Sequence, residues 1–218
     1  MKFLELDSPF HRFMSSVADM MLLGLLWFFL SIFIIPLGAA TTALFYVSTK
    51  RHTGKSSYIW REFWRSFAQN FIKATIINII FLGLFLLLFF NMLNMGLFEG
   101  NLATTIIVFQ LFMVIQLLFI MVYIYPLLAR FNLKFSEYFK TAFFLANRHL
   151  LTTLMCVASL AGLVFLSWFA FLPFILVLMG FYANVSSALM IKIFRKHRPD
   201  FDASEEDEEN LEKTSKNS

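Results

Sequence analysis

Charged residues are scarce in this sequence. They make up 15% of its 218 residues, whereas hydrophobic residues make up 59%, and the mean hydropathy is +0.73. Soluble domains carry about 25% charged residues, so this deficit excludes an ordinary soluble fold and indicates lipid as the solvent. Cysteine is almost absent as well. The single Cys156 excludes both an intrachain disulfide framework and a cysteine metal site.

Catalytic motifs are also missing. The sequence has no His-Glu-x-x-His, no Gly-x-Ser-x-Gly and no glycine-rich phosphate loop ending in Lys-Ser/Thr. Its four histidines all lie beside basic residues at predicted cytoplasmic ends, which suits contact with lipid headgroups better than metal ligation. No ionisable residue lies at the middle of a predicted membrane span. We therefore expect no enzymatic activity, no catalytic or metal-binding residue, no cofactor and no nucleic-acid partner.

Long uncharged stretches locate the membrane helices, because about 20 apolar residues cross a core ~30 Å thick. The first and last of these stretches are too long for one helix, and Pro36 and Pro173 interrupt them. Reading each as a hairpin predicts an all-α, polytopic transmembrane bundle of six helices, with five as the alternative. The predicted spans, within a transmembrane domain of residues 1–199, are residues 14–35, 38–53, 74–98, 102–129, 150–171 and 173–194.

Lysine and arginine set the orientation. They cluster in residues 50–73, 130–148 and 192–198, while the other loops carry Glu99 alone or no charge. The positive-inside rule places these three segments in the cytoplasm. The C-terminus is then cytoplasmic, and with six spans the N-terminus is cytoplasmic too.

The C-terminal segment has the opposite charge. Residues 200–218 hold two lysines and eight acidic residues, with Leu211 as the one large apolar side chain. Such a segment cannot bury a core. We expect a disordered, acidic, cytoplasmic tail.

Two of the basic segments have the pattern of amphipathic helices that lie along a membrane surface. In residues 57–73, aromatic side chains recur every three or four positions with polar residues between them. Residues 136–141 repeat the order of an acid, two aromatics, a base and a hydroxyl found at residues 62–66, which suggests an internal repeat. We expect two cytoplasmic elbow helices that either anchor to headgroups or bind a partner. The candidate contact residues are Trp60, Arg61, Phe63, Trp64, Arg65, Phe67, Glu137, Tyr138 and Lys140.

Amide side chains are the main polar groups inside the predicted spans. Gln110, Gln116 and Asn184 are candidates for lining a polar cavity. The alternative is that they join helices by hydrogen bonds, which is the commoner use of amides in membrane proteins.

The N-terminal third resembles a known family. Residues 36–47 read Pro-Leu-Gly-Ala-Ala-Thr-Thr-Ala-Leu-Phe-Tyr-Val, and residues 58–67 read Tyr-Ile-Trp-Arg-Glu-Phe-Trp-Arg-Ser-Phe. These runs are similar to the N-terminal signature of the YesL-like bacterial membrane proteins, most strongly over residues 19–76. Gly24 departs from the family, which often has Asn there. The resemblance implies a multi-pass protein of the bacterial plasma membrane, often encoded beside carbohydrate-uptake transporters of the ATP-binding-cassette (ABC) type, and it implies no ligand or catalytic residues.

Together these features lead to a functional hypothesis. The chain would be a non-enzymatic accessory subunit associated with a carbohydrate-uptake ABC transporter. Its partners would be the lipid bilayer and either the transporter permeases or a second copy of the chain. A small stand-alone transporter and a structural membrane protein without a ligand are the alternatives.

Overall fold

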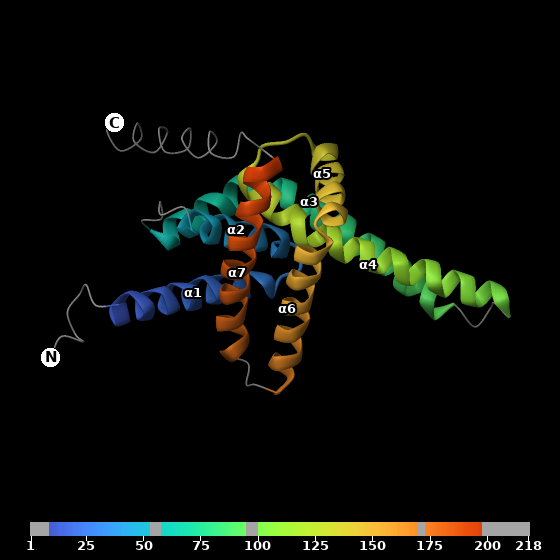
Figure 1. Cartoon of the computed structure of the whole chain (residues 1–218), viewed down its shortest axis with the longest axis horizontal. Coiled ribbons are helices and arrows are strands. Elements are labelled where there is room, and N and C mark those ends of the chain that lie inside the picture. The colour runs from blue at the N-terminus through green and yellow to red at the C-terminus, as the bar shows by residue number, and fades with distance from the viewer. Residues whose placement is uncertain (1–8, 53–57, 95–99, 170–172, 198–218) are drawn as a thin grey trace.

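The computed structural model describes residues 9–52, 58–94, 100–169 and 173–197. These residues form α-helices joined by short connections, and no strand occurs among them (Figure 1). The predicted all-α class is confirmed. The helices are α1 (Pro9–Ser31), α2 (Leu37–His52), α3 (Ile59–Leu93), α4 (Asn101–Arg130), α5 (Phe135–Arg148), α6 (Leu150–Phe169) and α7 (Pro173–His197).

The first uncharged stretch forms the predicted hairpin. Helix α1 ends at Ser31, and α2 begins directly after Pro36, whose ring cannot continue a preceding helix. The two helices are joined by a hydrogen bond of 3.0 Å from the indole nitrogen of Trp27 to Oγ1 of Thr41. The break between them therefore follows from the proline in the sequence.

Helix α2 lies at the centre of the molecule. It contacts α1, α3, α4 and α7, and twelve of its sixteen residues are buried. Small residues allow this close packing: a Cβ atom at Gly38 would lie 2.6 Å from the carbonyl oxygen of Ala74 on α3. At 16 residues α2 is about 24 Å long, shorter than the ~30 Å apolar core of a bilayer. Its role in the structure is to pack the other helices together.

Helix α3 corrects the prediction of a separate first elbow. The amphipathic segment of residues 57–73 and the apolar segment that follows form one helix from Ile59 to Leu93. No proline or glycine interrupts residues 59–82, so nothing in the sequence breaks the helix between the two segments. With 35 residues, α3 is about 52 Å long and exceeds the thickness of the apolar core.

The second predicted elbow is confirmed as a separate helix. Helix α5 meets α6 at an angle of 97°. The hydroxyl of Thr153 lies 2.9 Å from the carbonyl oxygen of Ala146 and 3.0 Å from that of His149, and it lies 3.1 Å from the hydroxyl of Tyr123 on α4. These contacts satisfy backbone groups that the bend frees, so they hold the corner between α5 and α6.

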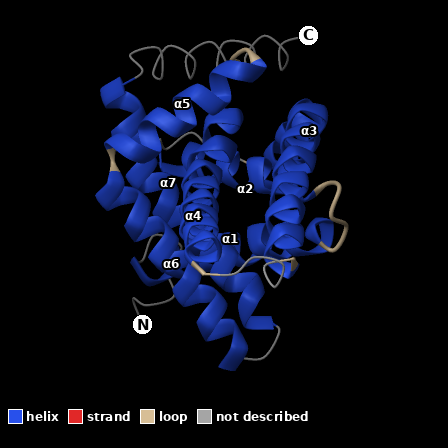
Figure 2. Cartoon of the chain, turned by 90° about the vertical axis from the view of Figure 1, so that its right-hand side faces the viewer, coloured by secondary structure: helices blue, strands red, loops and turns tan. Residues whose placement is uncertain are grey.

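Within the described residues, three helices are long and apolar enough to cross a membrane: α1 from Met14, α3 and α4. The bent pair of α5 and α6 would make a fourth. The six predicted spans are therefore not confirmed. Two pairs, α3 with α4 and α6 with α7, extend from the centre in different directions (Figures 1 and 2). Part of the predicted turn before Pro173 and the whole acidic tail lie outside the described residues.

Candidate functional site

The first half of α3 carries a row of aromatic side chains, here called the aromatic ridge: Trp60, Trp64, Phe67 and Phe71. Phe67 is half-buried against the core and the other three are exposed. They are spaced three or four residues apart, so they lie on one face of the helix. Successive ring centroids are 5.9, 5.5 and 5.4 Å apart, and the first two contacts are edge-to-face. Trp60 is 58% exposed and Trp64 is 38% exposed. The ridge therefore presents ordered aromatic surface away from the helices behind it.

The opposite face of this half of α3 packs on α2. Glu62, Phe63 and Ser66 are buried there. Phe63, one of the predicted contact residues, is completely buried and belongs to the core. Arg61 is exposed beside the ridge, and Arg65 is half-buried. Some of the predicted contact residues, such as Arg61, are therefore on the surface, whereas Phe63 packs inside the protein.

A buried ion pair fixes the ridge to the core. The ammonium group of Lys50 lies 2.9 Å from a carboxylate oxygen of Glu62, and the two side chains are only 7% and 8% exposed. Lys50 is in the last turn of α2 and Glu62 is in the first turn of α3, so each charge also complements the dipole of its own helix. Sequence reasoning missed this pair. The available signal was that Glu62 is the one acidic residue in a segment of six cations.

The ring of Tyr46 lies close to two cations, one of which belongs to this pair. Lys50 and Arg130, the last residue of α4, each lie 5.8 Å from the centre of its ring. Both distances suit a cation–π interaction, which is strengthened by burial. The ends of α2 and α4 and the start of α3 therefore meet in one buried charged cluster.

The end of α2 is also tied to α1 and α7. Arg51 forms an ion pair of 3.3 Å with Asp19 on α1. The Nε2 atom of His52 lies 2.8 Å from the carbonyl oxygen of Asn184 on α7. These contacts hold α2, on which the ridge-bearing half of α3 packs, firmly against α1 and α7.

The predicted contact residues of α5 have mainly structural roles. The hydroxyl of Tyr138 is buried, donates to the carbonyl oxygen of Phe131 at 2.6 Å and accepts from the backbone N–H of Leu133 at 3.1 Å. Burial raises the pKa of Tyr138, so the phenol stays neutral. Glu137 accepts a hydrogen bond from the backbone N–H of Lys134 at 3.3 Å and caps the helix. Lys140 is exposed.

The three cavity candidates are not joined in one site: Gln110 and Gln116 lie on α4 and Asn184 lies on α7. Gln110 on α4 accepts a hydrogen bond of 3.0 Å from Asn91 on α3 and donates to the carbonyl oxygen of Leu88. The backbone oxygen of Asn184 faces α2, as described above. Gln116 is half-buried, and its amide nitrogen has no partner among the described residues. No described hydrogen bond joins any two of the three.

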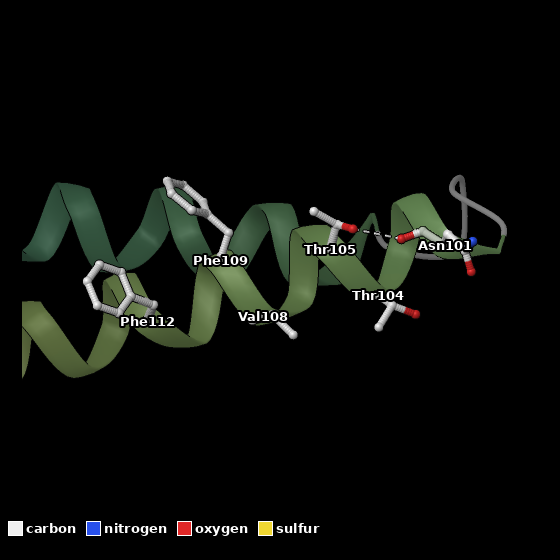
Figure 3. A pocket seen from close by; sticks show the side chains of 6 residues that line it. All are labelled: Asn101, Thr104, Thr105, Val108, Phe109 and Phe112. Atoms are coloured by element: carbon white, nitrogen blue, oxygen red, sulfur yellow. Dashed lines mark hydrogen bonds between the residues drawn. The ribbon is translucent and has the colours of Figure 1, made fainter.

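A shallow depression of about 620 Å³ lies on the N-terminal half of α4 (Figure 3). The hydroxyl of Thr105 donates to the carbonyl oxygen of Asn101 in the same helix at 2.9 Å, and no charged side chain lines the depression. It offers an apolar surface and no reactive group. Its lining residues are Asn101, Thr104, Thr105, Val108, Phe109 and Phe112.

Residues 20–92 match the family described as "Protein of unknown function, DUF624". The match spans the end of α1, all of α2 and nearly all of α3, so it includes the aromatic ridge and the Lys50–Glu62 pair. It is consistent with the YesL-like resemblance of residues 19–76, and it assigns no activity. No curated protein and no solved structure matches the chain.

Proposed function

We propose that the chain is a non-enzymatic accessory subunit of a carbohydrate-uptake ABC transporter and that the aromatic ridge of α3 binds the transporter. The observation that carries this proposal is the ordered, largely exposed row from Trp60 to Phe71, joined rigidly to the core through Glu62. The YesL-like resemblance suggests the class of transporter, and the ridge is the surface that would bind it.

The chemistry of the ridge suits a protein partner. Tryptophan and arginine are enriched among the residues that dominate binding energy at interfaces, and Arg61 is exposed beside Trp60 and Trp64. The ring contacts already restrict these side chains before binding. A partner would therefore lose little conformational entropy by ordering them.

The acidic groups of the described residues support a role without catalysis. Asp19 is paired with Arg51, Glu62 is paired with Lys50, and Glu137 caps α5. Each carboxylate thus has a structural partner. The surface left for function is aromatic and cationic, which suits binding better than acid–base chemistry.

Co-purification of the tagged full-length chain from its native membrane tests the proposal. Gentle solubilisation followed by mass spectrometry should recover two permeases and an ATPase with the wild-type chain. Trp60→Ala with Trp64→Ala should reduce their recovery at least tenfold, since two such residues each contribute about 2 kcal/mol. The matched control is Phe89→Ala with Phe90→Ala, which removes two exposed aromatics from the other end of α3.

The two variants separate partner binding from general loss of apolar surface. Phe89→Ala with Phe90→Ala should keep the thermal stability of the wild-type chain, because exposed substitutions change it by about 0.5 kcal/mol or less. The ridge variant also loses ring contacts of Trp64 worth about 0.5–1.5 kcal/mol each, so thermal unfolding is used to show that it still folds. Equal recovery of the transporter with both variants would refute the ridge as its binding surface. Recovery of the wild-type chain alone would refute the accessory role.

A further inference from the structure

Two histidines from different helices meet at the corner between α5 and α6. His149 is the residue between these helices, and His197 is the last residue of α7. Their ring centroids are 4.8 Å apart and their planes are nearly perpendicular. The sequence predicts headgroup contact for the histidines in general, and the structure brings these two, which are not part of the aromatic ridge, into contact with each other.

One buried nitrogen of this pair has no hydrogen-bond partner among the described residues. The Nδ1 atom of His197 lies 3.1 Å from the carbonyl oxygen of Ile193, so Nδ1 carries the proton and Nε2 is left for another contact. The Nε2 atom of His149 is buried and has no hydrogen-bond partner among the described residues. A buried polar atom without a partner is costly. A polar ligand at the corner would remove that cost.

The charges around the pair favour an anion. Arg148 and Lys196 are both exposed beside it, one at the end of α5 and one at the end of α7. Residues 150–166 of α6 contribute no charged side chain. Burial, then His197, Lys196 and Arg148, lower the pKa of His149, so the charges of the described residues that act on this ring are cationic.

Apolar surface begins immediately beyond these cations. Leu150, Leu151, Leu154 and Met155 are exposed on the first two turns of α6, and Leu151 is 76% exposed. The guanidinium group of Arg148 lies 5.4 Å from the centre of the Phe144 ring. Because α6 leaves α5 at 97°, cations at the corner and apolar side chains along α6 lie in the order of a phospholipid headgroup and its acyl chains.

We propose that His149, His197, Arg148 and Lys196 form a binding site for the phosphodiester of an anionic phospholipid, whose acyl chains lie along α6 at Leu151. The two cations supply charge. The protonated histidines donate hydrogen bonds from Nε2 to the phosphate oxygens, and His197 can do so only in this form because its Nδ1 proton is already donated to the carbonyl oxygen of Ile193. An anion binds the protonated imidazoles more tightly than the neutral ones. Binding therefore strengthens as the pH falls, and because the pKa of His149 is lowered by burial and by the neighbouring cations, this strengthening occurs below the ordinary histidine range.

The test uses full-length protein in a zwitterionic detergent. Short-chain phosphatidylglycerol, short-chain phosphatidylcholine and inorganic phosphate are titrated separately at pH 7.5 and pH 5.5. Arg148→Gln with Lys196→Gln should weaken phosphatidylglycerol binding about 25-fold, at roughly fivefold for each cation lost. The control, Lys134→Gln with Lys140→Gln, removes the same charge from elsewhere near α5 and should change binding less than twofold. His149→Gln with His197→Gln should abolish the strengthening at pH 5.5.

Four results would overturn the proposal. If the control variant weakens phosphatidylglycerol binding equally, the lipid responds to the overall surface charge and not to a site at the corner. Equal binding of phosphatidylcholine would remove the requirement for an anionic lipid. Inorganic phosphate that binds as tightly as the lipid would make the ligand a soluble anion. Binding that appears only after residues 200–218 are deleted would make the acidic tail the occupant of the corner. Thermal unfolding of each variant in detergent identifies any variant that fails to fold. If the double histidine variant fails, His149→Gln alone replaces it.

Discussion

The sharpest test of the fold is the replacement of Glu62 by glutamine. This change keeps the size of the side chain but removes the carboxylate charge that lies 2.9 Å from the ammonium group of Lys50, and both side chains are more than nine-tenths buried. Removal of one partner from a buried ion pair costs about 3–5 kcal/mol. Lys50 retains its contact with the ring of Tyr46 at 5.8 Å, which contributes about 0.5–2 kcal/mol. We therefore expect a loss near the lower limit, about 3 kcal/mol.

A double replacement checks the cause of that loss. The second carboxylate oxygen of Glu62 is buried without a hydrogen-bond partner among the described residues, so the pair itself is incompletely satisfied. Apolar replacement of both partners of such a pair is often neutral or stabilising. Lys50→Met with Glu62→Leu should therefore restore stability to within about 1 kcal/mol of the wild-type chain.

The assay is unfolding of the purified protein in mixed micelles by a rising fraction of sodium dodecyl sulfate, followed by far-ultraviolet circular dichroism. Glu137→Gln is the matched control, because Glu137 is exposed at the first turn of α5 and should cost far less. If Glu62→Gln costs no more than Glu137→Gln, the buried pair does not stabilise the fold. If the double replacement costs as much as Glu62→Gln, the loss comes from packing and the electrostatic argument is wrong.

Four further substitutions test other contacts by the same unfolding assay. Thr153→Val removes the hydroxyl that holds the corner between α5 and α6, and should cost about 1–3 kcal/mol and increase proteolysis near the bend; unchanged cleavage would contradict that role. Gly180→Ala places a Cβ atom against the carbonyl oxygen of Met20 where α7 crosses α1, and should destabilise by about 1–3 kcal/mol. Gly162→Ala, which meets no atom within 4 Å, should be neutral or stabilising, and equal effects at the two glycines would refute the close crossing. Tyr138→Phe leaves the carbonyl group before α5 without its donor and should cost about 1–3 kcal/mol, whereas a neutral result would mean that water replaces the hydroxyl.

The sequence by itself determined the features that depend on neighbours along the chain. The helical class and the lipid-facing character follow from long uncharged runs, and the break before α2 follows from Pro36. The spacing of Trp60, Trp64 and Phe71 also predicted one aromatic face, because helical periodicity is local. Each of these features is decided by residues within a few turns of one another.

Only the tertiary structure decided which charges are buried and which elements are continuous. Lys50 and Glu62 look like ordinary loop charges in the sequence, and they pair because α2 and the start of α3 pack side by side. The burial of Phe63 has the same origin. Residues 59–82 contain no helix breaker, and the packing of the first half of α3 on α2 favours one continuous helix there. His149 and His197 are 48 residues apart, and nothing local to either one indicates that their rings meet. The contacts between distant segments arise from the way whole helices pack, and that packing is not encoded in the pattern of any one segment.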